Sequence, residues 1–161
     1  MTEPLTAAAS LQDVPATEID LHIERHFAAR PERVFQALTD PSELVRWWGP
    51  EGFTVPECEL DVRPGGAWRT CLRNPKGSLH CASGIYREVV PPKRLVYTWS
   101  WETGDPRHET LVTIELEPRD GGTDLTLRHQ GFESDDSRDQ HAGGWGGCFD
   151  CLVQYLSEDS Q

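Results

Sequence analysis

The chain has 161 residues, with 15 Lys or Arg against 27 Asp or Glu, which gives a formal net charge of −12. This length suits one domain with a sizeable core. The negative charge repels phosphate backbones and anionic membranes, and no apolar run approaches the ~18 residues of a membrane span, so we expect neither nucleic-acid binding nor membrane insertion.

The N-terminal part predicts a tail, a strand and two short helices. Residues 1–18 show no sustained period and lack the basic start and apolar run of a secretory signal, so we expect a disordered tail on a cytoplasmic protein. Strict alternation from Ile19 to Phe27 predicts a half-buried strand. Pro31 and the pair Asp40-Pro41 then mark the starts of two short helices, the second ending near Trp47.

The remainder predicts an antiparallel meander followed by one long helix. Between residues 53 and 132 a period of two is interrupted by the turn sequences RPGG, NPKG, VPPKR, TGDPR and RDGGT, which indicate five or six strands. Ser134 is a candidate N-cap, and apolar residues at helical spacing predict a helix ending near Ser157. The expected fold is α+β, with a single domain at residues 19–157 and a short tail at 158–161.

The long helix contains four glycines, Gly143, Gly144, Gly146 and Gly147. Each interior glycine costs about 0.8 to 1 kcal/mol relative to alanine, so the surroundings must compensate. The missing side chains either let the backbone lie close to another element or leave open space beneath the helix. Because a twisted sheet cannot close tightly along one helix, we also expect a cavity between the two.

Five segments in this order resemble the SRPBCC (START-like, Bet v 1-like) superfamily: PERVFQALTDPSELVRWWGP, PGGAWR, GIYREVVPPKRLVYTW, GGTDLTLRHQGF and GGWGGCFDCLVQYL. Within that superfamily the chain is most similar to the family named after the activator of Hsp90 ATPase. The resemblance implies a helix-grip fold, a curved antiparallel sheet of six or seven strands wrapped round a long C-terminal helix. It also implies either a carrier of hydrophobic ligands, an enzyme such as a polyketide cyclase, or a chaperone-related role in the stress response.

Aromatic side chains dominate the candidate ligand site. Six tryptophans could supply the amphipathic walls that a flat or acyl ligand requires, although core packing is the alternative for each of them. The expected lining of the cavity comprises Trp48, Trp68, Leu72, His80, Tyr97, Trp99, Val112, Ile114, Leu127, His129, Trp145 and Phe149.

Two histidines in this set depend on which strand face points inward. If the hairpin at NPKG is symmetric about Lys76, Trp68 lies opposite Gly84 and Leu72 lies opposite His80, which directs His80 inward. His129 shares a face with Leu127 on the last strand. An inward imidazole could bind a polar ligand group or act as acid or base, or it could be a satisfied core residue.

The cysteines predict no metal site. Five is an odd number that fits reduced thiols, so Cys71 and Cys81 are expected to be free although their register allows a bridge. Cys148 and Cys151 form a lone CxxC, which we interpret as small buried thiols because a zinc site needs further ligands. No nucleophile, phosphate-binding loop or paired-carboxylate motif is recognisable, so we expect no catalytic residue and no cofactor.

These patterns predict a domain that binds a small hydrophobic, aromatic or amphipathic molecule in an internal cavity. The alternatives are a cyclase- or hydratase-like enzyme that uses His129 or His80, and a module that interacts with an Hsp90-type chaperone. Because only about eighteen residues precede the first strand, we expect no counterpart of the extra N-terminal domain of the eukaryotic co-chaperone. A homodimer is compatible with the sequence.

Overall fold

Seven strands form a single antiparallel sheet in the computed structural model, which describes residues 19–102 and 109–158. The strand order is β1-β7-β6-β5-β4-β3-β2, so β2 to β7 form a meander and β1 pairs with the last strand. The elements are β1 (Asp20–Phe27), α2 (Pro31–Thr39), α3 (Pro41–Trp47), β2 (Thr54–Leu60), β3 (Ala67–Arg73), β4 (Leu79–Val90), β5 (Arg94–Trp101), β6 (Thr110–Arg119), β7 (Gly122–Gln130) and α4 (Asp135–Ser157).

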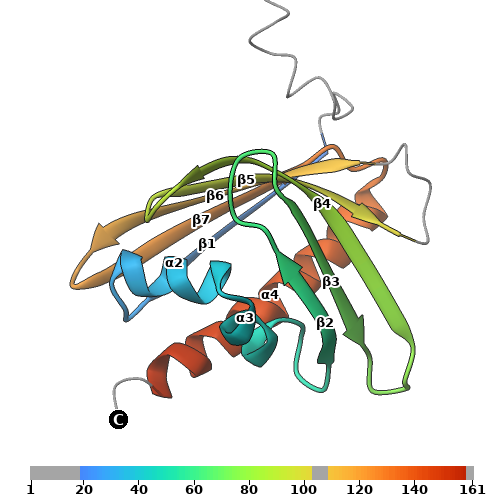
Figure 1. The fold of residues 1–161 in the computed structure, drawn as a ribbon, viewed down its shortest axis with the longest axis horizontal. Helices are drawn as coiled ribbons and strands as arrows, with labels where there is room; N and C mark the ends of the chain where they lie inside the picture. Colours follow the sequence, from blue (N-terminus) through green and yellow to red (C-terminus); the bar gives the residue numbers. More distant parts are fainter. Residues whose placement is uncertain (1–18, 103–108, 159–161) are drawn as a thin grey trace, which may run out of the picture.

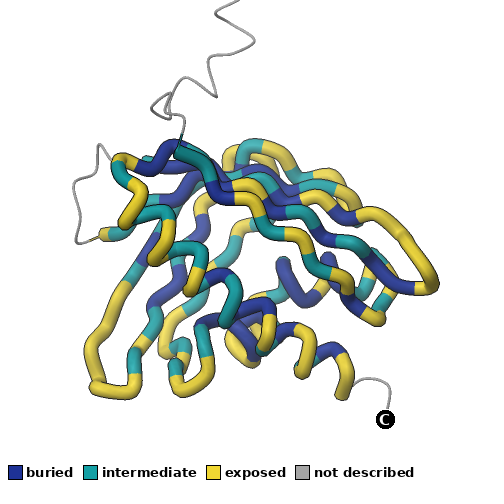
Figure 2. The backbone as a smooth tube through the Cα atoms, turned by 180° about the vertical axis from the view of Figure 1, so that it is seen from behind, coloured by how far each residue is buried: buried dark blue, intermediate teal, exposed yellow. Residues whose placement is uncertain are grey.

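The sheet curves round helix α4, and α2 and α3 lie on the same side of the sheet as α4 (Figure 1). Buried segments concentrate between the sheet and the helices, while the ends of the hairpins are exposed (Figure 2). This is the α+β helix-grip architecture that the sequence predicts. The predicted tail at 1–18 and the predicted turn TGDPR lie outside the described residues, and no described helix is long and apolar enough to cross a membrane.

The three helices begin where the sequence places their caps. Pro31 is the first residue of α2, and the Asp40 carboxylate accepts a hydrogen bond of 2.9 Å from the backbone N–H of Ser42 at the start of α3. Ser134 caps α4, because its hydroxyl accepts a hydrogen bond of 3.1 Å from the backbone N–H of Ser137. These caps satisfy backbone donors that would otherwise lack partners in the first turn.

One face of the sheet is directed inward along its whole width. In β7, Leu127 lies opposite Ile23 on one side and Ile114 on the other, and His129 lies opposite Leu21 and Val112. Alternation along each strand therefore places these residues on the same face, against α4. The predicted phase of β7 is confirmed by this register.

The predicted register of the β3–β4 hairpin is also confirmed, since Trp68 pairs with Gly84 and Leu72 with His80. The Trp68 indole donates a hydrogen bond of 3.0 Å to the Thr98 carbonyl, and a Cβ on Gly84 would lie 1.9 Å from that carbonyl oxygen and 2.8 Å from the Trp68 nitrogen. Gly84 therefore makes room for the Thr98 carbonyl and for the tryptophan that bonds to it.

The expectation that all five cysteines are free is wrong for two of them. Cys71 and Cys81 form a disulfide, whereas Cys58, Cys148 and Cys151 are free. Cys71 lies between Thr70 and Leu72, which face inward, so the disulfide lies on the outer face of the sheet. Antiparallel pairing brings the two Cβ atoms within bonding reach, and an odd number of cysteines does not exclude one such bridge. Reduced thiols therefore no longer support a cytoplasmic location, which stays a prediction.

The glycines of α4 serve both of the expected purposes, close approach to another element and open space beneath the helix. A Cβ on Gly147 would lie 3.0 Å from the Pro50 Cβ, so the helix approaches the loop after α3 closely at this point. A Cβ on Gly143 or Gly144 would meet no heavy atom within 4 Å. Gly143 is exposed to solvent, but Gly144 borders a cavity, so its missing side chain leaves open space beneath the helix.

Candidate functional site

Two cavities lie between the sheet and the helices. The inner cavity has a volume of about 40 Å³, and its apolar lining consists of Leu38, Leu44, Trp47, Trp48, Leu60, Trp68, Thr70, Tyr86, Leu95, Tyr97, Trp99, Ile114 and Trp145. The outer cavity has a volume of about 270 Å³ and is lined by Trp48, Pro50, Leu72, Trp99, Trp101, Gln140, His141, Gly144, Trp145 and Cys148. Of these two cavities, the outer one approaches the size of a small-molecule site, which begins near 300 Å³.

Three tryptophans separate these two cavities. Trp48, Trp99 and Trp145 line both of them, and their ring centroids are 5.2 to 6.0 Å apart. They come from three different parts of the fold, namely the loop after α3, strand β5 and helix α4. We call Trp48, Trp99 and Trp145 the tryptophan wall.

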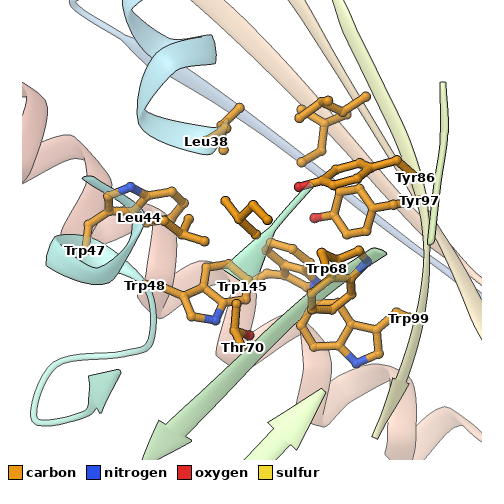
Figure 3. A pocket seen from close by; sticks show the side chains of 13 residues that line it. Leu38, Leu44, Trp47, Trp48, Trp68, Thr70, Tyr86, Tyr97, Trp99 and Trp145 are labelled. Atoms are coloured by element: carbon orange, nitrogen blue, oxygen red, sulfur yellow. The ribbon is translucent and has the colours of Figure 1, made fainter. Parts of the chain in front are cut away.

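The inner cavity carries few polar groups. Figure 3 shows the hydroxyl groups of Tyr86 and Tyr97 side by side, both directed toward the interior of the cavity. Burial raises the pKa of each phenol above its usual value of 10, so both remain protonated at neutral pH. A volume of about 40 Å³ holds only a few water molecules, so this cavity is an extension of the core rather than a ligand site.

His129 is completely buried behind the tryptophan wall and has a hydrogen-bond partner at each ring nitrogen. The Trp145 indole donates to Nδ1 at 3.0 Å, and Nε2 lies 2.7 Å from the Thr110 hydroxyl oxygen. Because an indole N–H can only donate, we assign the proton of the neutral ring to Nε2, which donates to Thr110. Thr110 in turn donates to the Trp99 carbonyl at 3.2 Å. Desolvation by burial holds the pKa of His129 well below its usual 6.5, so the ring is neutral.

His141 repeats this arrangement at the edge of the outer cavity. The Trp101 indole donates to its Nε2 at 2.9 Å, and its Nδ1 donates to the Ser137 carbonyl at 2.8 Å. Burial lowers the pKa of this imidazole as well. Both histidines therefore have their nitrogens occupied by protein groups and serve to orient tryptophans around the cavities.

The Cys148 thiol, which borders the outer cavity, is buried and protonated. The backbone N–H of Gly49 donates to the Cys148 sulfur at 3.2 Å, and burial raises the pKa of the thiol to about 12. A protonated, desolvated thiol is a poor nucleophile and a poor metal ligand. The prediction of a small buried thiol is confirmed for Cys148, whereas Cys151 is only half-buried.

The predicted site residues separate into three groups. Seven line a cavity, namely Trp48, Trp68, Leu72, Tyr97, Trp99, Ile114 and Trp145. Four are fully buried core residues that line neither cavity, namely Val112, Leu127, His129 and Phe149. His80 is exposed, because it lies near the turn of the β3–β4 hairpin, and the prediction that it lines the cavity is wrong.

Several lining residues were missed, and two signals could have found them. Trp101 lies two residues beyond Trp99 on the same strand face, so alternation predicts it. His141, Gly144 and Cys148 recur at intervals of three and four residues on the same stripe of α4 as Trp145, which predicts a shared face. Pro50 and Gln140 carried no comparable signal.

The strand arginines do not reach the cavities. Arg69 forms ion pairs with Glu57 at 2.5 Å and with Glu102 at 2.8 Å on the outer face of the sheet. Arg94 pairs with Glu88 and Glu115 on that face. Among the described residues that line the outer cavity there is no lysine or arginine.

A curved sheet gripping a C-terminal helix, with aromatic-walled space between them, defines a helix-grip domain. The family model for "Activator of Hsp90 ATPase homolog 1-like protein" matches residues 28–157. The chain belongs to this family, as the order of its motifs predicts.

Three known proteins illustrate the relationship. The AHSA1 protein of Silicibacter pomeroyi is 33% identical, with a TM-score of 0.78 over 88% of this chain and 99% of that one. A protein of Chromobacterium violaceum is 31% identical, with a TM-score of 0.74 over 84% of this chain and 96% of that one. The human "Activator of 90 kDa heat shock protein ATPase homolog 1" is 24% identical over 82% of this chain, which spans only 34% of the human protein's length.

Proposed function

We propose that residues 19–157 form a single ligand-binding domain that holds a small hydrophobic or amphipathic molecule in the outer cavity. The observation that supports this most is the cavity itself, about 270 Å³ of space beside the tryptophan wall where the sheet and α4 do not close. Its lining is mainly aromatic and aliphatic with a few polar groups, which is the usual composition of small-molecule sites.

The glycine at position 144 supports the same proposal. Alanine would favour the helix by about 0.8 to 1 kcal/mol, yet glycine borders the cavity where a methyl group would meet no atom within 4 Å. Neither close packing nor backbone conformation requires glycine here. Keeping the cavity open is the function that we assign to it.

The catalytic alternative has less support. Both nitrogens of His129 and of His141 are engaged by protein groups, and His80 is exposed and lines neither cavity. A general acid or base must come within hydrogen-bond reach of the substrate. Neither His129 nor His141 offers a free nitrogen to a molecule in the outer cavity.

A chaperone-related function is the second candidate, and the family membership favours it. The human relative is named for activation of a 90 kDa heat shock protein ATPase. Because this chain spans about a third of that protein, stimulation of an Hsp90 ATPase is a separate proposal for this domain. The test is an ATPase assay with and without the purified protein, in which an unchanged rate would count against it.

A thermal-shift screen with fatty acids, flavonoids and polyketide-like aromatic compounds tests the ligand-binding proposal, together with native mass spectrometry of the protein as purified. We expect at least one class to raise the Tm in a concentration-dependent manner, since a ligand that binds only the folded state stabilises it. Failure of every class, with no co-purified molecule, would overturn the proposal.

A further inference from the structure

Two indole N–H groups at the tryptophan wall have no hydrogen-bond partner among the described residues. They belong to Trp48 and Trp99, whose exposed fractions are 8% and 5%. The other four tryptophans donate to protein atoms: Trp47 to the Ala37 carbonyl, Trp68 to the Thr98 carbonyl, Trp101 to His141 and Trp145 to His129. Buried donors without partners are rare in native proteins, because each has lost its water without replacement.

Both tryptophans border the space where a ligand would be. Trp48 and Trp99 are neighbours, with ring centroids 6.0 Å apart, and both line the outer cavity. In Figure 3 their nitrogens lie on the ring edges that face away from Tyr86 and Tyr97, which line only the inner cavity. Each nitrogen is itself buried from water, so a ligand in the outer cavity must shift the ring edge slightly to accept its hydrogen bond.

The surroundings determine which acceptor suits these donors. The cavity walls include the rings of Trp99, Trp101, Trp145 and His141, which favour a flat aromatic body. No lysine or arginine is present among the described lining residues, and His141 is a neutral ring with both nitrogens engaged. A carboxylate would be buried without a counter-charge in a chain of net charge −12, whereas a carbonyl oxygen needs only donors.

We infer that the outer cavity selects neutral, flat aromatic molecules bearing a carbonyl oxygen, such as aryl ketones or quinones, which accept hydrogen bonds from the indole N–H groups of Trp48 and Trp99. This inference rests on the proposed ligand-binding function and narrows its ligand class.

A matched pair of probes tests the role of the carbonyl group. 2-Acetylnaphthalene and 2-isopropenylnaphthalene have the same shape, but the second replaces C=O by C=CH₂. Trp48→Phe and Trp99→Phe keep an aromatic ring and remove the donor. Each variant is expected to reduce the preference for the ketone over the hydrocarbon by about three- to tenfold, which corresponds to one neutral hydrogen bond. Trp47→Phe is the control, since Trp47 lies outside the outer cavity and its N–H already has a partner.

The dissociation constants are measured by calorimetry, and the six indole N–H resonances are followed in ¹H–¹⁵N spectra, which also confirm that each variant is folded. We expect the ketone, and not the hydrocarbon, to shift the Trp48 and Trp99 resonances downfield. An equal ratio of the two dissociation constants in the unchanged protein and in all three variants would overturn the inference while leaving ligand binding intact. If neither probe binds, the inference is overturned, whereas the ligand-binding proposal is decided by the screen of fatty acids, flavonoids and polyketide-like compounds.

A third probe, 2-naphthoate, tests the neutrality of the ligand. It has a similar size but carries a carboxylate, so the cavity is expected to bind it more weakly than the ketone. Tighter binding of the naphthoate would contradict the neutral class and would indicate a cation that reaches the bound molecule.

Discussion

At the scale of single residues, the tryptophans around the cavities are positioned by neutral histidines. Trp145 donates to His129 and Trp101 donates to His141, and in each case the other ring nitrogen bonds to a protein oxygen. A protonated imidazole cannot accept a hydrogen bond, so either contact is lost when the ring gains a proton. The histidines thereby couple the packing of the aromatic cluster to pH.

Acidification is therefore expected to destabilise the fold. Both histidines have folded-state pKa values below 6.5, so at pH 5 to 6 the unfolded chain binds protons that the folded chain does not. The free energy of unfolding should fall as pH drops through about 6.5, by up to about 1.4 kcal/mol per pH unit for each histidine, until the folded-state pKa is reached. Urea denaturation between pH 5 and 8 measures this slope.

Two glutamine variants isolate the contribution of the imidazole. His141→Gln keeps an acceptor for Trp101 but does not titrate, so its stability should depend less steeply on pH than that of the unchanged protein. His22→Gln is the matched control, because His22 is exposed on the outer side of β1. Equal slopes for His141→Gln and His22→Gln would show that His141 does not carry the effect.

At the scale of elements, helix α4 combines two uses of glycine. Gly147 permits close approach to Pro50, and Gly144 leaves the cavity open, whereas Gly143 is exposed and touches nothing. The helical stripe predicts α4 correctly despite these residues. The position at which α4 crosses the loop after α3 decides the role of each glycine. No local pattern in the sequence encodes that crossing.

Alanine substitutions distinguish these roles. Gly143→Ala should raise the free energy of unfolding by about 0.5 to 1 kcal/mol, because alanine loses less backbone entropy in a helix and adds no contact. Gly147→Ala should give no gain or a loss, since its Cβ would lie 3.0 Å from Pro50 and the loop would have to move. Chemical denaturation measures both, and equal stabilisation by the two substitutions would contradict the close approach.

Local patterns also predicted some of the site residues and not others. Alternation fixed the inward face of β3, β5 and β7, so Trp68, Trp99 and His129 were placed on the correct side. Alternation does not tell whether an inward residue meets a cavity or the core, and His129 belongs to the core while Trp99 lines both cavities. The prediction for His80 was wrong for a further reason, because the inward face of the sheet is exposed where it extends beyond the helices.

At the scale of the whole molecule, the cavity follows from closing a curved sheet with one helix. The C-terminal half of α4 is fixed to α2 and α3, because Tyr155 donates to Glu43 at 2.8 Å and Glu43 pairs with Arg33 at 2.7 Å. The N-terminal half faces β3 and β5, where the outer cavity remains. The fold is common to the family, and this chain's tryptophan wall and Gly144 define the space inside it.

Calorimetric titration of 2-acetylnaphthalene into Gly144→Leu and Gly143→Leu tests the location of the ligand most directly. The leucine at position 144 should enter the outer cavity and weaken binding by at least about tenfold, because a filled cavity leaves no room for the ligand without displacing packed groups. The leucine at position 143 points to solvent and should leave the Kd unchanged. Equal affinities in the two variants would contradict binding in the outer cavity.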